Sequence, residues 1–206
     1  MTSSLPLVLA STSPYRRELL SRLGINFSIC SPEVDESRHA GESPSELVLR
    51  LSEAKARAGA AQTGDALVIG SDQVAVVGDE VLGKPGSIER ACAQLSRLAG
   101  QQVTFLTGLC LYNSATRNVQ LDLVPFRVSF RKLSASQIED YVHRERPLNC
   151  AGSFKSEGLG IALFERMEGD DPTALIGLPL IRLVNMLEAE SVSVLCGPDS
   201  GKINDQ

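Results

Sequence analysis

Short apolar runs alternate with longer amphipathic stretches along most of this chain, which predicts strands interleaved with helices. The apolar runs predict strands at 5–10, 26–31, 66–70 and 73–77, with 81–85 also extended. The amphipathic stretches predict helices at 14–23, 44–62, 88–98 and 135–144. Capping signals mark three of these helix starts, at Ser13-Pro14, at Ser43-Pro44 with Glu46, and at Ser134 with Gln137.

A change of pattern follows in the second half of the chain. Residues 103–112 and 119–130 alternate and are rich in β-branched and aromatic side chains, which predicts an antiparallel hairpin. A glycine-bearing loop at 152–160, a strand at 161–167 and a helical stretch at 173–190, broken near Gly177 and Pro179, complete the pattern. The predicted fold class is therefore α/β, with a mixed sheet, helices packed around it and a central cleft between two lobes.

Composition narrows the class of protein. The length of 206 residues and the hydrophobic fraction of 43% suit a single domain of two lobes over 1–196, and we expect 197–206 to be a disordered tail. The net charge of −5 disfavours stable nucleic-acid binding, which needs a broad basic face. That charge still permits a small anionic ligand in a locally basic pocket.

The cysteines and histidines exclude some kinds of site. The five cysteines are odd in number, far apart and without a C-x-x-C pair, so neither a disulfide framework nor a zinc site is expected. With two histidines, a metal would have to bind carboxylates and phosphate oxygens. No apolar run has the length of a membrane span, and the short apolar start has no basic leader. We expect a cytoplasmic protein without membrane contact.

The first candidate site is an anion site at the start of the first helix. Three hydroxyl residues, Ser11 to Ser13, follow a buried strand, and Arg16 and Arg17 lie in the first turn. The free N–H groups and the dipole of a helix N-terminus attract anions. Cations there oppose the dipole, and a bound phosphate would remove that cost. The alternative is that both arginines are ordinary solvated residues.

Carboxylates and lysines supply the remaining candidates. Glu33, Asp35 and Glu36 follow a strand and would hold Mg²⁺ or Mn²⁺, unless they form a solvated acidic loop. Asp72 interrupts an apolar run, where a carboxylate needs a partner, a metal or a role as general base, unless the chain turns or bulges there. Three lysines, Lys55, Lys84 and Lys155, would together neutralise a triphosphate, although any one of them alone could be an ordinary solvated residue. The glycine-rich phosphate loops and the nucleophile elbow are absent, so Ser11 is read as a phosphate ligand.

The motifs in their order resemble one family over most of the chain. From about Leu5 to Leu187, the segments LASTSPYRRELL, PEVDE, EAKA, IGSDQV, LGKP, TGLCLY, AGSFKSEG and IGLPL are similar to those of the Maf-like nucleotide pyrophosphatases. The resemblance implies a two-lobed fold with a cleft, a divalent cation, and hydrolysis between the α and β phosphates. It implies Asp72 as the catalytic proton acceptor, Glu33 and Asp72 at the metal, and a phosphate site built from Ser11, Arg16, Arg17, Lys55, Lys84 and Lys155. It also implies a homodimer.

Three positions resemble the 7-methyl-GTP pyrophosphatase branch of that family. They are Tyr15, Gln73 and Glu157, where the dTTP/UTP branch typically carries Arg, Thr and Gln. An aromatic face attracts the positive charge of a 7-methylated guanine, and Tyr15 would supply that face. Glu157 would accept hydrogen bonds from guanine N1–H and the 2-amino group. The branch often has Trp at the position of Tyr15, which is the one departure.

Three alternatives remain open at this point. The first is the dTTP/UTP pyrophosphatase activity of the same family. The second is a nucleotide-binding regulator of septum formation without catalysis, against which the retained Asp72 and the basic residues argue. The third is a nucleic-acid-binding module, which the acidic charge and the lack of a basic stripe with interleaved aromatics disfavour.

Overall fold

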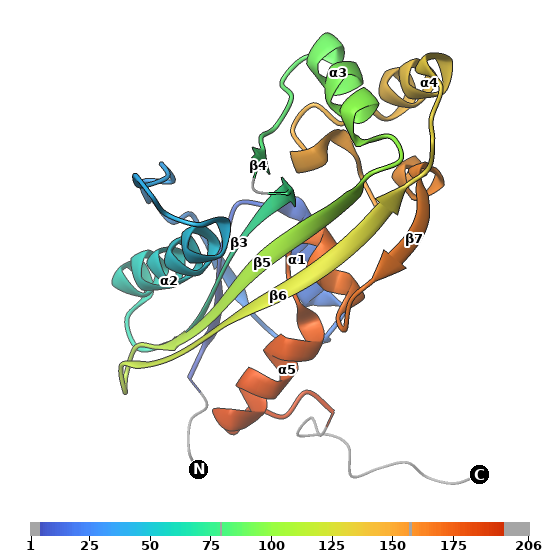
Figure 1. Cartoon of the computed structure of the whole chain (residues 1–206). Helices are drawn as coiled ribbons and strands as arrows, with labels where there is room; N and C mark the ends of the chain where they lie inside the picture. Colours follow the sequence, from blue (N-terminus) through green and yellow to red (C-terminus); the bar gives the residue numbers. More distant parts are fainter. Residues whose placement is uncertain (1–4, 79, 157, 196–206) are drawn as a thin grey trace, which may run out of the picture.

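The chain folds around one mixed sheet in which three long central strands run from end to end (Figure 1). The computed structural model describes residues 5–78, 80–156 and 158–195. The strands within them are β1 Leu7–Ala10, β2 Ser28–Cys30, β3 Leu67–Val77, β4 Glu80–Leu82, β5 Gln102–Asn113, β6 Asn118–Phe130 and β7 Phe164–Glu168. Their order is β2-β1-β3-β5-β6-β7, and β4 pairs with β3.

The sheet is mixed because it combines parallel pairing at β1 with antiparallel pairing from β3 onward. β1 pairs in parallel with both β2 and β3, after helical crossovers. The pairs β3–β4, β3–β5, β5–β6 and β6–β7 are antiparallel. This confirms the predicted α/β class with a mixed sheet and the predicted hairpin at 103–130.

Helices cover both faces of the sheet. The described α-helices are α1 Pro14–Ser21, α2 Pro44–Thr63, α3 Ile88–Leu98, α4 Ala135–Glu145 and α5 Leu180–Ala189. Side chains alternate along β3, so Val68 packs against α2 on one face while Leu67 and Ile69 pack with α1 and α5 on the other. The helices α3 and α4 pack on the far ends of β5 and β6, around Phe105 and Phe130. The helices therefore form two groups, α1, α2 and α5 at one end of the sheet and α3 and α4 at the other.

The local sequence signals account for the helix starts. Ser13 and Ser43 accept the backbone N–H of Arg16 and Glu46, and Ser43 and Ser134 both form complete capping boxes. The predicted break near Gly177 is also present, because Gly177 has a left-handed φ of 116° and ends the 3₁₀ helix η3 Pro172–Ile176.

Several boundaries differ from the sequence prediction by a few residues, and two of these differences have a clear structural reason. The segments predicted at 66–70 and 73–77 form the single strand β3, because β5 pairs with it continuously from Leu67 to Val76. The strand predicted at 161–167 begins only at Phe164, because the 3₁₀ helix η2 Leu159–Leu163 comes first. Among the described residues, no helix is both long enough and apolar enough to cross a membrane.

Candidate functional site

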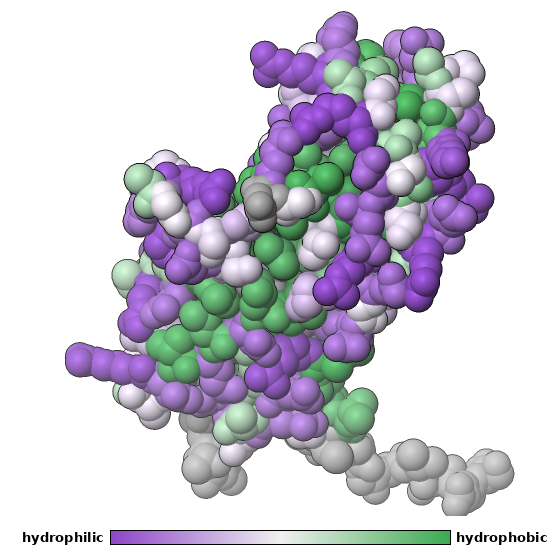
Figure 2. All heavy atoms as spheres, viewed as in Figure 1, coloured by the Kyte–Doolittle hydropathy of each residue, from purple (hydrophilic) through white to green (hydrophobic). Residues whose placement is uncertain are grey.

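A pocket lies where the neighbours of β3 change. On one edge, β3 pairs with β1 as far as Ile69 and with β4 from Ala75 onward. Between these stretches, no strand of the described residues pairs with this edge of β3 at Asp72, whose other edge pairs with Gly108 of β5. Strands that separate in this way leave a crevice at the sheet edge, where ligands commonly bind in α/β proteins. Figure 2 shows apolar side chains in a hollow between the α2 region and the α3 end.

The pocket has a volume of about 770 Å³ and is lined from both halves of the chain. The lining includes residues singled out from the sequence, among them Ser11, Tyr15, Arg16, Glu36, Lys55, Asp72, Gln73 and Lys84. Apolar side chains such as Leu51, Val74 and Phe105 complete its lining. The volume and the mixed lining suit a small molecule that has both an apolar part and charged groups.

Glycines allow α2 to approach the sheet beside this pocket. An added Cβ at Gly70 in β3 would lie 2.1 Å from the carbonyl oxygen of Ser52, and one at Gly108 in β5 would lie 2.4 Å from that of Val48. No side chain fits at either position without a shift of the helix backbone. The glycines therefore let α2 lie directly on β3 and β5, which brings Lys55 to the level of Asp72.

Lys55 joins two carboxylates. Its Nζ lies 2.6 Å from Oδ1 of Asp72 and 2.6 Å from Oε1 of Glu36. The side chains of Lys55 and Asp72 are 9% and 13% exposed, whereas that of Glu36 is 61% exposed. The hydrogen bond from Lys55 holds the pKa of Glu36 below its usual range, and the charges of Lys84 and Arg16 act in the same direction.

The backbone of Asp72 is held separately from its carboxylate. Its N–H donates to Oγ of Ser52 on α2 at 2.9 Å. The Ser52 hydroxyl in turn donates to the Val48 carbonyl at 2.6 Å, and Ser52 is fully buried. Loss of an acceptor for a buried N–H is costly, so Ser52 helps to fix the backbone of Asp72 against α2.

Arg16 is anchored by a loop from the other end of the sequence. Its Nε donates to the Gly177 carbonyl at 2.8 Å, and Oγ of Ser71 donates to the same carbonyl at 2.9 Å. Burial lowers the pKa of Arg16, while the negative charges of Asp72 and Glu36 oppose that shift. With Nε engaged, the terminal nitrogens of the guanidinium are the donors that remain for an anion in the pocket.

Gln73 is oriented by acceptors behind it. Its Nε2 donates to the Ala174 carbonyl at 2.6 Å and to Oγ1 of Thr107 at 2.9 Å. The Thr107 hydroxyl donates to the same Ala174 carbonyl at 2.9 Å, so it acts as an acceptor for Gln73. The amide NH₂ is thus directed toward η3, and the carbonyl Oε1 of Gln73 is the group available for a ligand.

The other predicted site residues lie elsewhere. Arg17 and Glu33 are exposed and are not among the pocket-lining residues. Nζ of Lys155 donates to the carbonyl of Glu145, the last residue of α4, at 2.8 Å, which is a favourable position for a cation at a helix C-terminus. Glu157 falls outside the described residues.

Sequence reasoning named part of the site and missed the rest. Glu36 is one of three candidate carboxylates in the acidic run, and it is the one that meets Lys55, whereas the resemblance implied Glu33. The run of three carboxylates in four residues was the available signal, but nothing in it distinguished one member from another. Ser52 and Gly177 gave no signal, because their roles depend on contacts between distant segments.

The carboxylates fit a divalent cation shared with a substrate. No group of three or more Asp, Glu, His or Cys side chains that could hold a metal occurs in the described part of the chain. Asp72 and Glu36 nevertheless converge on one cation, the Lys55 ammonium. Proteins commonly bind Mg²⁺ through one or two carboxylates together with substrate phosphates, so this donor set suits such an ion when phosphate is bound.

Comparison with known proteins identifies the family. A model of the Maf-like protein family matches residues 6–190. A 7-methyl-GTP pyrophosphatase of Pseudomonas putida is 60% identical over 190 residues, which cover 92% of this chain and 99% of that protein. Proteins of the same name from Pseudomonas aeruginosa and Alcanivorax borkumensis are 59% and 57% identical, over 91% and 94% of this chain and 98% and 99% of their own lengths. The chain therefore belongs to the family of Maf-like proteins.

Proposed function

We propose that this protein is a pyrophosphatase that hydrolyses 7-methyl-GTP to 7-methyl-GMP and pyrophosphate. The observation that carries the proposal is the group formed by Asp72, Lys55 and Glu36 beside Arg16, within one pocket at the free edge of β3. The names of the relatives, which match nearly their whole length, support the same reaction and substrate.

In the proposed reaction, water attacks the α phosphorus and the bond between that phosphorus and the bridging oxygen of the β phosphate breaks. Lys55 bonds Oδ1 of Asp72, so Oδ2 would accept the proton of the attacking water. Arg16 and Lys84 would donate to the phosphate oxygens on which charge develops. Bound Mg²⁺ or Mn²⁺, held by Glu36, Asp72 and phosphate oxygens, would neutralise charge and polarise the phosphorus.

Recognition of the base is assigned to the far side of the pocket. Tyr15 lines the pocket and would stack on the cationic 7-methylguanine ring. Oε1 of Gln73 would accept a hydrogen bond from the base, in line with the orientation of its amide. Two further assignments stay predictions. One is Glu157 as acceptor for guanine N1–H and the 2-amino group, and the other is the placement of Arg17, Glu33 and Lys155 at the phosphates or metal.

Pyrophosphate release tests the proposal. Wild-type protein with Mg²⁺ or Mn²⁺ is assayed against 7-methyl-GTP, GTP, dTTP, UTP and CTP, alongside Asp72→Asn and the control Asp65→Asn, which changes an exposed aspartate. We expect preference for 7-methyl-GTP and a loss of about 10²–10⁴-fold in Asp72→Asn alone. Preference for dTTP or UTP would overturn the substrate, and no release from any nucleotide would favour a binding protein.

We also propose a cytoplasmic homodimer. The free thiols of Cys30, Cys92, Cys110 and Cys150 support the location, and the proposed nucleotide substrate agrees with it. The oligomeric state is measured by size-exclusion chromatography with light scattering, and a mass of one chain at micromolar concentration would contradict the dimer.

A further inference from the structure

The residues between β2 and α2, here called the acidic loop (31–43), carry Glu36 to the pocket. Glu36 is 61% exposed, and an exposed ion pair does little to hold a long side chain in one place. The pairing of Glu36 with Lys55 therefore does not by itself explain why the acidic loop approaches the catalytic group. A second attachment is needed, and the structure contains one at the neighbouring residue.

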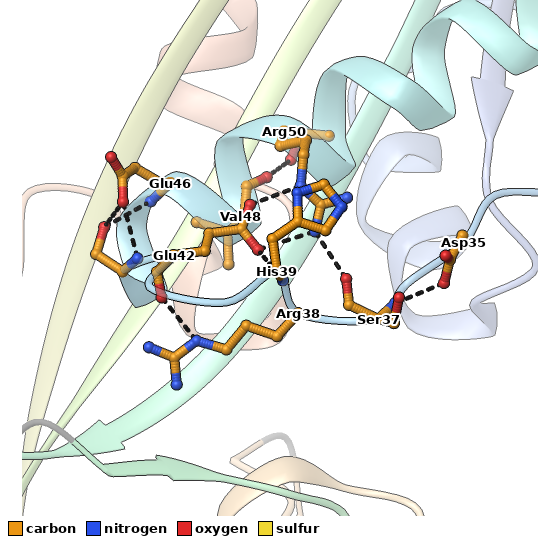
Figure 3. Close-up of polar contacts among 10 residues, drawn as sticks. Asp35, Ser37, Arg38, His39, Glu42, Glu46, Val48 and Arg50 are labelled. Atoms are coloured by element: carbon orange, nitrogen blue, oxygen red, sulfur yellow. Dashed lines mark hydrogen bonds and ion pairs between the residues drawn. The ribbon is translucent and has the colours of Figure 1, made fainter.

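Arg50 of α2 supplies that attachment (Figure 3). Its Nη2 donates to the carbonyl of Ser37 at 2.9 Å, so two consecutive residues are tied to α2, Ser37 by its backbone and Glu36 by its side chain. The same guanidinium forms a two-point ion pair with Glu42, with Nε at 2.6 Å from Oε1 and Nη2 at 2.9 Å from Oε2. Arg50 thus holds the acidic loop at its middle, through Ser37, and near its C-terminal end, through Glu42.

Glu42 also accepts hydrogen bonds from other residues of the acidic loop. Its Oε2 accepts the backbone N–H of His39 at 3.0 Å, and its backbone carbonyl accepts Nε of Arg38 at 2.7 Å. The Glu42 side chain is 8% exposed, unlike most of the acidic loop, so its carboxylate forms the centre of the loop's hydrogen bonding. Bidentate Arg–carboxylate pairs are more specific in geometry than single ion pairs.

We propose that the pair Arg50–Glu42 positions Glu36 against Lys55 and Asp72, and so prepares the carboxylate pair for a divalent cation. Arg50 and Glu42 are positioning residues, since they act through the backbone of the acidic loop. The inference rests on the proposed function only for the identity of the cation. Its central claim concerns the placement of Glu36 and is measurable without turnover.

The variants compare this pair with another ion pair of the same helix. Arg50→Gln and Glu42→Gln remove the positioning pair, and Arg50→Lys keeps the charge without the two-point geometry. The matched controls are Arg57→Gln and Glu53→Gln, because Nε of Arg57 lies 2.8 Å from Oε1 of Glu53 on α2, away from the acidic loop. Glu36→Gln provides the reference for loss of the positioned carboxylate.

Two readouts do not depend on activity. Backbone hydrogen exchange of residues 31–43 should accelerate at least 10-fold in Arg50→Gln and Glu42→Gln, less in Arg50→Lys, and remain as in the wild type in both controls. Mn²⁺ binding in the presence of pyrophosphate, followed by electron paramagnetic resonance, should weaken about 10-fold in the same variants. Adding Arg50→Gln to Glu36→Gln should weaken it little further, since both act on one carboxylate.

The outcomes separate this inference from the proposed function. Loop exchange like the wild type in Arg50→Gln and Glu42→Gln would overturn it, as would faster exchange with Mn²⁺ binding intact. Equal effects in the Arg57 and Glu53 controls would also overturn it. If Arg50→Gln does not fold, Glu42→Gln and Arg50→Lys carry the test. A protein that releases no pyrophosphate but shows the expected exchange and Mn²⁺ pattern would contradict the proposed function alone.

Discussion

Two regions bring groups to the same pocket by different physical means. The α2–sheet interface, defined by Ser52 and Lys55 on α2 and by Gly70 and Gly108 on the strands, is buried and has no room for an added carbon atom. The acidic loop is largely exposed and is held by directional bonds from Arg50. The first region should therefore respond to a change of volume, and the second to the loss of a donor or acceptor.

The largest effect is expected from Gly70→Ala. The new Cβ would lie 2.1 Å from the Ser52 carbonyl oxygen, which belongs to the helix backbone and cannot rotate away. We expect a loss of about 3 kcal/mol in the free energy of unfolding. A displacement of α2 would also separate Lys55 from Asp72, and activity should fall about 100-fold. Urea unfolding and pyrophosphate release measure the two effects.

Gly83→Ala is the stability control for that substitution. A Cβ at Gly83 would meet no atom within 4 Å, and the φ of this residue is not positive. Its free energy of unfolding should stay within about 0.5 kcal/mol of the wild type or rise slightly. Equal destabilisation by both substitutions would show that the α2–sheet interface is not the tight contact described here.

A smaller effect on stability is expected from Ser52 in the α2–sheet interface, and almost none from Ser37 in the acidic loop. Ser52→Ala removes the Oγ that accepts the N–H of Asp72, so the free energy of unfolding should fall by about 1 kcal/mol. In the acidic loop, Ser37 accepts Arg50 through its backbone carbonyl, and its backbone N–H donates to Asp35. Ser37→Ala keeps both bonds and should change that free energy by less than about 0.5 kcal/mol.

Denaturant unfolding of the two serine variants, with turnover of 7-methyl-GTP, tests this contrast. Ser52→Ala should lower the maximal rate more than it raises the Michaelis constant, because Asp72 is displaced and the substrate contacts of Arg16 are not. Equal stability of the two variants would contradict the assignment of Ser52 as a support for the backbone of Asp72.

Features that depend on neighbouring residues could be predicted from the sequence, whereas features that depend on distant contacts could not. Local signals decided the helix starts, so the capping boxes at Ser43 and Ser134 are present as expected. Helix phase also separates Arg16 from Arg17 in principle, because Arg16 precedes the buried Leu19 and Leu20 by three and four positions. The sequence therefore contains a signal that places Arg16 on the same face of α1 as these buried leucines.

Contacts between distant segments were beyond local reasoning. The choice between Glu33 and Glu36 depends on the attachment of the acidic loop to Arg50, which no pattern within the loop encodes. Likewise, the need for glycine at 70 and 108 becomes visible only when α2 lies on β3 and β5. The continuity of β3 through Asp72 depends on pairing with β5 and on the charge of Lys55.

The pH dependence of the Glu42 carboxylate tests how the acidic loop is held. The hydrogen bond from Arg50 is the main cause that lowers the pKa of Glu42 from 4.5 to about 2, and the His39 N–H and the charges of Arg50 and His39 add to it. Because the folded pKa is depressed, the stabilisation by this carboxylate is present above about pH 4.5 and is lost as the pH falls toward 2. Arg38, Asp35 and Glu46 are the other charged groups nearby.

Carboxyl chemical shifts measured by NMR follow this titration directly. We expect a midpoint near 2 for Glu42 in the wild type and a return toward 4.5 in Arg50→Gln. Arg57→Gln should leave the midpoint in place, because Arg57 pairs with Glu53. An unchanged midpoint in Arg50→Gln would mean that the pair Arg50–Glu42 does not form in solution.

The smallest effect is expected at a thiol behind the α2–sheet interface. Burial raises the pKa of Cys110 in β5 to about 12, and the negative charge of Glu53 adds to this shift. Only the thiolate reacts with iodoacetamide, so at pH 8 about one Cys110 in 10⁴ would be reactive even if the reagent could reach it. Peptide mass spectrometry of briefly alkylated protein should therefore find Cys110 modified far more slowly than the partly exposed Cys30, Cys92 and Cys150. Gly70→Ala, by loosening α2, should accelerate its modification, whereas Glu42→Gln should not, because the acidic loop does not cover it.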